Sequence, residues 1–215
     1  MNTQLIKPLL RGHFHQAAFF MALGACLMLI AKAQGIKGIT AALIYSISLL
    51  TLFGASALYH RPQWKPNIRS WMKRIDHSAI FILISGTITP VCLLALPPVA
   101  GTKLLVITWI TAIFGIIQSI FWVKAPKWVS SFIYLCAGWL TLSYLPEMKN
   151  ALPTLDLVYI IIGGVIYSFG AIIYAFKKPN PFPRVFGYHE IFHLLVIIAA
   201  FFHFMVVNRL MNNTF

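Results

Sequence analysis

The sequence predicts an all-α membrane protein in which seven helices cross the bilayer. Hydrophobic residues make up 60% of the 215-residue chain and charged residues only 10%, whereas soluble domains are about 45–50% apolar and about 25% charged. The apolar residues also gather into seven segments, each close to the roughly 20 residues that a spanning helix needs. Because the loops between them are short, we expect one transmembrane domain over residues 1–215.

The seven segments are separated by polar, basic or proline-rich stretches. We expect them at residues 16–31, 38–59, 75–96, 103–123, 128–145, 155–176 and 188–207. The first segment is short, and the Ala31-Lys32-Ala33 stretch at its end is similar to a signal-peptidase site. We interpret it as a slightly short spanning helix rather than as a cleaved signal.

The distribution of lysine and arginine predicts the orientation. Twelve of the 17 basic residues fall before the first segment or in the loops after the second, fourth and sixth segments. Cytoplasmic loops carry the excess of basic residues, so we predict a cell-membrane protein with its amino terminus in the cytoplasm and its carboxyl terminus outside. The net charge of +13 then faces anionic lipid at the cytoplasmic surface, and it does not indicate a protein that binds nucleic acid.

The three cysteines do not form a redox or metal motif. Cys26, Cys92 and Cys136 each lie inside an apolar run, and no CxxC spacing occurs. We expect them to be small buried side chains without a disulfide.

Ionisable side chains gather at one end of three predicted segments. His60 ends the second segment, Asp76 begins the third, and His189 and His193 begin the seventh. In the predicted orientation all four lie near the cytoplasmic boundary, and the two histidines of the last segment are about 6 Å apart along one helix face. Ionisable residues in membrane helices are costly, so this group is a candidate functional site.

Three histidines at one depth suit a catalytic Zn2+ site, in which three protein ligands leave a fourth position for water. Zinc lowers the pKa of water toward 7 and polarises a substrate carbonyl. Asp76 is the candidate to hold that water and take its proton. Ser56 lies one turn before His60, where its hydroxyl could hydrogen-bond a ligand, the water or a developing oxyanion.

The remaining ionisable residues near these positions are not expected to bind the metal. His77 points about 100° away from Asp76 on a helix, and Glu190 lies off the face that carries the two histidines of the last segment. Three further histidines are expected outside the site, two at the membrane interface and one packed in the outer half of the last segment: His13, His15 and His203, respectively.

Four blocks of the sequence resemble the signature blocks of the hemolysin III family. They are Ser56–His60, Arg74–Ile80, Gly86–Pro90 and His189–His193. That family belongs with the progestin and adiponectin receptors in a superfamily of seven-helix membrane proteins that also includes alkaline ceramidases. The resemblance covers the second to seventh segments.

The resemblance implies a zinc site and a reaction. In adiponectin receptors three histidines bind zinc from the cytoplasmic side, with an aspartate and a serine around the bound water. By motif position this implies His60, His189 and His193 as ligands, Asp76 at the water and Ser56 as a supporting group. The superfamily further implies a metal-dependent hydrolase that acts on an amide or ester bond of a membrane lipid.

Before its first segment the chain departs from the family. Arg11-Gly12-His13-Phe14-His15 stands where many bacterial members have an acidic pair and a Ser/Thr-His-Gly stretch, so no role is carried over to these residues. Three other functions remain open. The chain could be a non-catalytic, receptor-like regulator with a structural zinc, or a pore-forming haemolysin, which seven apolar helices with few polar faces argue against. It could also hold haem between histidines of two helices.

Overall fold

The computed structural model describes residues 8–212, and the regular structure of this part is helical apart from one isolated β-bridge between Phe182 and Phe186. The helices follow in this order: α1 (His13–Lys32), α2 (Gly35–His60), α3 (Pro66–Leu94), α4 (Pro98–Phe121), α5 (Lys127–Trp139), the 3-10 helix η1 (Leu140–Tyr144), α6 (Leu145–Ala151), α7 (Thr154–Phe176) and α8 (Tyr188–Asn212). Counting Lys127–Ala151 as one, seven helices of the described chain are long and apolar enough to cross a membrane. The predicted number of spans is confirmed.

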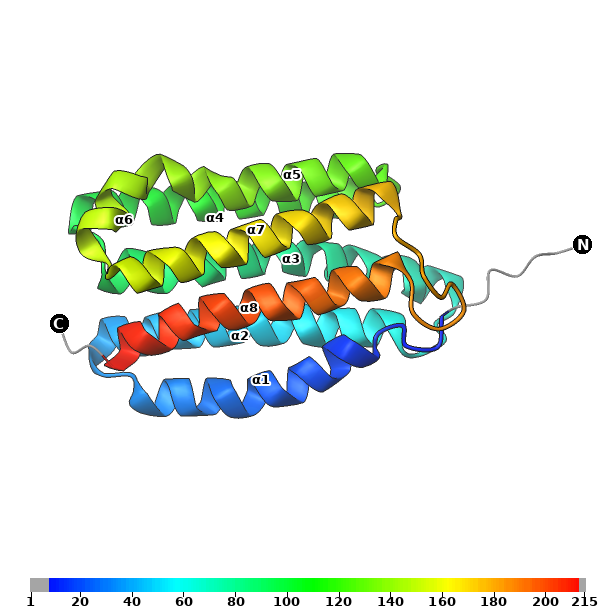
Figure 1. Cartoon of the computed structure of the whole chain (residues 1–215), viewed down its shortest axis with the longest axis horizontal. Coiled ribbons are helices and arrows are strands. Elements are labelled where there is room, and N and C mark those ends of the chain that lie inside the picture. The colour runs from blue at the N-terminus through cyan, green and yellow to red at the C-terminus, as the bar shows by residue number, and fades with distance from the viewer. Residues whose placement is uncertain (1–7, 213–215) are drawn as a thin grey trace, which may run out of the picture.

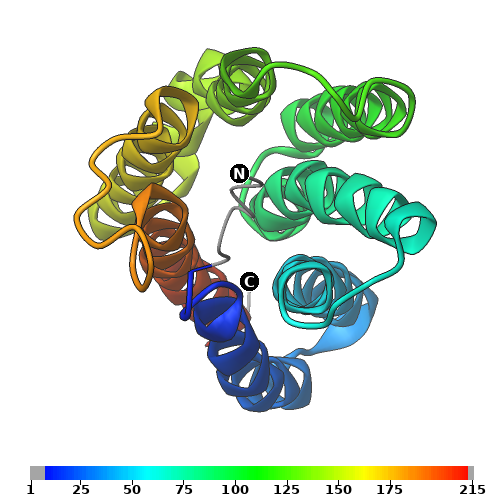
Figure 2. The same ribbon diagram turned by 90° about the vertical axis from the view of Figure 1, so that its right-hand side faces the viewer.

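The helices lie side by side along the long axis of the molecule (Figure 1) and form a ring when seen along that axis (Figure 2). Helices α1 to α4 pack against one another in chain order, and α5 packs against α7. Helix α8 closes the ring, because it packs against α7 on one side and α1 on the other and also touches α2 and α3. We call the end at which α8 begins the histidine end; it is on the right in Figure 1.

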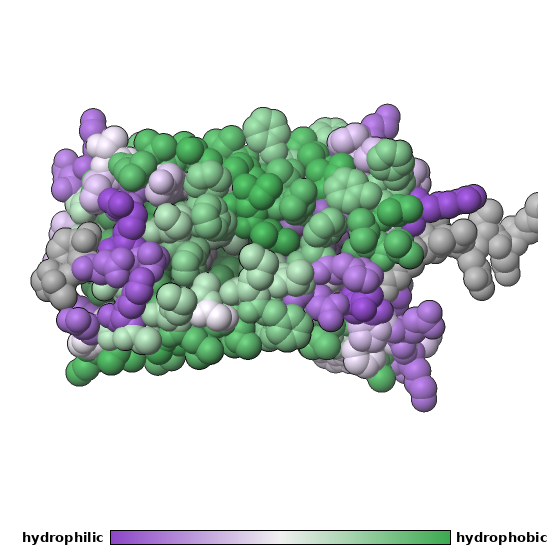
Figure 3. Space-filling model, turned by 60° about the horizontal axis from the view of Figure 1, so that its bottom comes forward, coloured by the Kyte–Doolittle hydropathy of each residue, from purple (hydrophilic) through white to green (hydrophobic). Residues whose placement is uncertain are grey.

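The outer surface has the polarity of a membrane protein. On the face that Figure 3 shows, hydrophobic residues form a broad belt across the middle of the bundle, and hydrophilic residues gather at its two ends. Large apolar side chains on several helices are exposed, among them Phe20, Phe114 and Phe169. A belt of this kind would expose a large apolar area to water, whereas in a bilayer it meets lipid chains. The chain is therefore a multi-pass membrane protein.

Several helices extend beyond the predicted apolar segments, and the largest extensions are at the start of α3 and at the end of the span that α5 begins. Helix α3 begins at Pro66, well before the predicted start at residue 75. Proline suits the first turn of a helix, because the N–H that it lacks would have no partner within the helix there. The segment predicted at 128–145 continues to Ala151 after a change to 3-10 geometry at Leu140. Pro146 lies in the first turn of α6, where a proline is tolerated.

The cysteines behave differently from one another. Cys26 and Cys92 are buried as expected, but Cys136 is exposed, so the expectation of a buried side chain was wrong for this residue. Its helix, α5, buries a different face, which carries Ser130, Ser131 and Ala137.

Candidate metal centre

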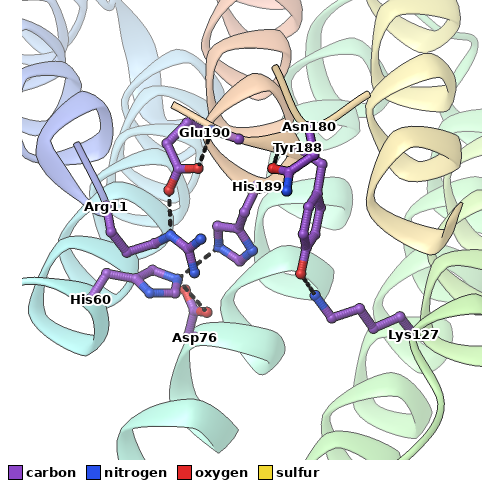
Figure 4. Close-up of polar contacts among 9 residues, drawn as sticks. Arg11, His60, Asp76, Lys127, Asn180, Tyr188, His189 and Glu190 are labelled. Carbon is purple, nitrogen blue, oxygen red and sulfur yellow. Dashed lines mark hydrogen bonds and ion pairs between the residues drawn. The ribbon is translucent and has the colours of Figure 1, made fainter. Parts of the chain in front are cut away.

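The start of α8 is fixed by polar contacts to its first backbone groups. The N–H of Gly187 donates to Oε2 of Glu190 at 2.9 Å, and the N–H of Tyr188 donates to Oδ1 of Asn180 at 3.3 Å (Figure 4). The first contact is half of a capping box, in which a glutamate in the first turn satisfies the backbone before the helix. These contacts set where α8 begins, and therefore which face of the helix carries its two site histidines.

Three buried histidines from two helices meet at the histidine end. His60 is the last residue of α2, and His189 and His193 lie in the first two turns of α8. The Nε2 atoms of His60 and His189 are 3.1 Å apart, and Figure 4 draws this contact between the two rings. One ring nitrogen from each of the three residues lies within 4.8 Å of the others. The structure thus brings together the three histidines that the sequence singled out.

The donor set of this cluster fits a metal ion. In a tetrahedral zinc site with Zn–N bonds of 2.0–2.1 Å, two ligand nitrogens are separated by about 3.3 Å. The 3.1 Å between His60 and His189 is close to this value. Two facing ring nitrogens can share only one proton in a hydrogen bond, whereas a cation satisfies the lone pairs of all three rings. The buried cluster of His60, His189 and His193 could therefore hold a metal ion.

A carboxylate and a hydroxyl lie beside the histidines. Oδ2 of Asp76, on α3, is 3.9 Å from Nε2 of His60. The side chain of Ser56, one turn before His60 on α2, faces the Asp76 carboxylate. Both residues line a cavity whose wall also includes His189 and His193. All five residues proposed from the sequence therefore occupy one site.

His15 is part of this site, although we expected it at the membrane interface. It is 2% exposed, and its ring stacks on that of His193 with 3.9 Å between centroids and 8° between planes. The expectation was wrong because α1 begins before the apolar stretch, and the helix carries His15 inward. The buried face of α1 continues from Ala18 and Ala22 back to His15 at helical spacing, and this period could have revealed it.

The other histidines have distinct positions. His77 stays outside the metal cluster, as expected, but it lines the cavities next to it. The ring of His13 is 2.6 Å from a guanidinium nitrogen of Arg61. His203 packs in the other half of α8, as expected, where it stacks on Tyr167 at 5.7 Å. Gly163 makes room for it, because a Cβ there would lie 2.5 Å from the ring of His203.

The segment before α1 is tied to the start of α8. Arg11 forms an ion pair with Glu190, which is 1% exposed (Figure 4). The N–H groups of Leu9 and Leu10 donate to the carbonyls of Arg184 and Val185 in the loop before α8. Glu190 therefore holds two segments against the helix that carries two of the three histidines. From the sequence we expected it at the cytoplasmic interface or in support of the ligands rather than as a ligand.

An apolar cavity of about 180 Å³ runs from the histidines into the bundle. Its walls come mainly from α3, α5, α7 and α8. The lining residues of α8 extend from His189 to Val207, which is about 27 Å along a helix axis. The chains of one lipid leaflet occupy about 15 Å, half of a hydrocarbon core of about 30 Å. The cavity is thus long enough for a lipid chain.

The fold and the cluster define a class of protein: a seven-helix membrane protein with a buried three-histidine site at one end of the bundle. Comparison with known families identifies it further. The chain matches the Haemolysin-III related family over residues 3–204 and belongs to that family. It is 38% identical over 154 residues to the hemolysin-3 homolog of Bacillus subtilis (strain 168), and the aligned residues cover 72% of this chain and 69% of that protein. It is 31% identical over 209 residues to hemolysin-3 of Bacillus cereus, covering 95% of this chain and 92% of that protein.

Proposed function

We propose that the protein is a zinc-dependent hydrolase of a lipid amide or ester. The observation that carries this proposal is the position of the three-histidine cluster. Two of its residues, His189 and His193, line a long apolar cavity together with a carboxylate and a hydroxyl. A structural metal site needs no cavity, whereas a hydrolase of lipids needs space for a chain next to its reacting groups.

In this proposal His60, His189 and His193 hold Zn2+. The bound ion supplies Lewis acidity, which polarises a substrate carbonyl and acidifies water. Asp76 orients the attacking water and takes its proton. The Ser56 hydroxyl donates a hydrogen bond to the oxyanion that develops on the carbonyl oxygen.

The reaction is a hydrolysis with a simple balance. The water oxygen forms a bond to the carbonyl carbon, and the bond from that carbon to the amide nitrogen or ester oxygen breaks. The proton that Asp76 took from water passes to the leaving group. The apolar cavity holds the acyl chain and excludes bulk water from the site.

The test compares lipid hydrolysis by wild type and Asp76→Asn in vesicles, using a panel of lipid amides and esters. We expect Asp76→Asn to retain its metal and to lose about a hundredfold to ten-thousandfold in rate, the usual contribution of a general base. Asp156→Asn, a buried aspartate at the opposite end of the bundle, should retain full activity. Full activity in Asp76→Asn would contradict the mechanism. A metal-loaded wild type that turns over none of the lipids would instead support a regulator with a structural metal.

The proposal also includes an orientation. Basic residues gather at the histidine end, which supports a cytoplasmic site in the cell membrane with the amino terminus inside. A chain without its natural cysteines would carry one new cysteine, Lys65→Cys at the histidine end or Lys103→Cys at the opposite end. In intact cells an impermeant thiol reagent should label only the second variant, and labelling of only the first would reverse the orientation.

A further inference from the structure

A second cavity lies at the histidine end, beside the metal cluster. Its volume is about 190 Å³, and its wall carries several charged side chains, whereas Asp76 is the one lysine, arginine or carboxylate residue in the wall of the apolar cavity. The charged residues of its wall are four cations and one carboxylate: Arg11, Arg69, Lys73, Lys127 and Asp76. We call this space the basic cavity.

The basic cavity and the apolar cavity meet at the candidate metal centre. They share four wall residues: Asp76, His77, Tyr174 and His189. One face of α3 lines both cavities. Arg69, Lys73 and Asp76 follow one another at spacings of four and three residues, so they share a helix face in the wall of the basic cavity. Ile80 and Leu83 continue this face into the apolar cavity. A molecule that filled both spaces would pass the three histidines.

The four cations of the basic cavity outnumber the carboxylates near it, because Asp76 is the one carboxylate in its wall. Arg11 is paired with Glu190. For Arg69, Lys73 and Lys127, no ion pair is present among the described residues 8–212. Of the chain's four acidic residues, the remaining two, Glu147 and Asp156, belong to α6 and the start of α7 at the opposite end of the bundle.

Neutral groups hold these three cations in the wall of the basic cavity. The guanidinium carbon of Arg69 lies 5.7 Å from the centre of the Tyr59 ring. Nζ of Lys73 donates to the carbonyl of Val123 at 2.8 Å. Nζ of Lys127 donates to the Tyr188 hydroxyl at 2.8 Å (Figure 4) and lies 4.1 Å from the centre of the Tyr174 ring. Such contacts fix the positions of the side chains but add no negative charge, so the wall keeps an excess of positive charge over the single carboxylate of Asp76. An anion in the basic cavity would supply the missing charge.

We propose that the substrate is a lipid with a phosphate-bearing head group. The phosphate lies in the basic cavity, the scissile carbonyl lies at the three histidines, and the acyl chain lies in the apolar cavity. A phosphate monoester carries a charge of about −1.5 to −2 at neutral pH, and its oxygens accept hydrogen bonds from lysine and arginine. This inference rests on the proposed hydrolase function for the meaning of the carbonyl position, but its test does not require turnover.

The test is a binding measurement on metal-loaded protein in dodecyl maltoside micelles, whose head groups carry no phosphate. The probes are oleoyl lysophosphatidate, monooleoylglycerol, which has the same chain without the phosphate, and inorganic phosphate. We expect oleoyl lysophosphatidate to bind at least about tenfold more tightly than monooleoylglycerol, the effect of one or more charge-assisted hydrogen bonds. Raising the salt concentration should weaken only the binding of the anionic lipid.

Two variants test whether the basic cavity is where the phosphate binds. Lys73→Gln should weaken lysophosphatidate about tenfold and leave monooleoylglycerol unchanged. The matched control is Lys124→Gln, which removes the same charge from an exposed lysine at the same end that does not line the basic cavity, and which should bind like wild type. If Lys73→Gln fails to fold, the salt dependence of lysophosphatidate binding to the wild type still tests whether the charged head group contributes to binding.

Equal affinity of the two lipids for wild type, with no salt dependence, would overturn the inference while leaving the hydrolase untouched. Inorganic phosphate that binds as tightly as lysophosphatidate would also overturn it, because the cavity would then be a site for small anions. Tight, salt-sensitive lysophosphatidate binding without hydrolysis would support the ligand class and count only against the proposed reaction.

Discussion

Replacement of Glu190 by glutamine should weaken both the fold and metal binding. The Glu190 carboxylate is buried, pairs with Arg11 and accepts the N–H of Gly187. Glutamine keeps the size and one acceptor oxygen but removes the charge. Breaking a buried ion pair costs about 3–5 kcal/mol, but Arg11 keeps some access to water, so we expect a loss of about 1.5–3 kcal/mol in the free energy of unfolding, the range for a hydrogen bond to a charged group.

The effect should reach the metal because His189 precedes Glu190 in the first turn of α8. Loss of the ion pair frees the segment before α1 from this turn and loosens the position of the His189 ring. Losing a partner outside the ligand shell typically lowers metal affinity by about 10–100-fold. Thermal unfolding in detergent measures the first effect, and zinc competition with a chromogenic chelator measures the second.

Asp156→Asn is the matched control for this experiment. Asp156 is also a fully buried carboxylate, and it is paired with Nε of Arg209 at 2.6 Å, but it lies at the opposite end of the bundle. We expect this variant to lose stability without losing zinc affinity. Equal zinc affinities for Glu190→Gln and Asp156→Asn would refute the coupling between the ion pair and the metal centre.

Two further predictions concern packing. His15→Phe should keep its zinc because the phenyl ring still stacks on His193. His15→Ala should bind zinc more weakly, because it loses a ring contact of about 0.5–1.5 kcal/mol. Metal analysis that finds zinc lost equally from both variants would make His15 a ligand. Gly86→Val should lower the free energy of unfolding by about 1–3 kcal/mol, because a Cβ there overlaps Ser48 of the neighbouring helix. Gly24→Val, at a position with open space, should unfold near the wild-type temperature, and equal transitions for the two valine variants would contradict this packing.

Hydropathy was sufficient to predict the class of fold, because a bilayer requires about 20 apolar residues for each crossing. It could not predict where helices end. Two helix starts lie outside the apolar stretches: the polar first turns of α3 from Pro66 and the start of α1 at His13. Whether such residues are helical depends on hydrogen bonding rather than on transfer to lipid. This is why His15 was expected at the interface and was found against His193.

The candidate site was predictable only where its residues share a depth. His60, Asp76 and the two histidines of α8 all lie near one boundary of their segments, so the topology alone brought them together. The ion pair of Arg11 with Glu190 joins residues far apart in sequence, and no spacing rule links them. The basic cavity likewise depends on how α3 and α5 pack around it, which hydropathy does not report.

Metal content of the purified protein tests the central claim most directly. Plasma mass spectrometry would compare wild type, His193→Ala and His203→Ala, the last being a histidine of the same helix outside the cluster. The account predicts about one zinc per chain in wild type and His203→Ala and none in His193→Ala, as for a site with three protein ligands. A folded wild type without metal, or a His193→Ala variant that keeps its full complement of zinc, would contradict it.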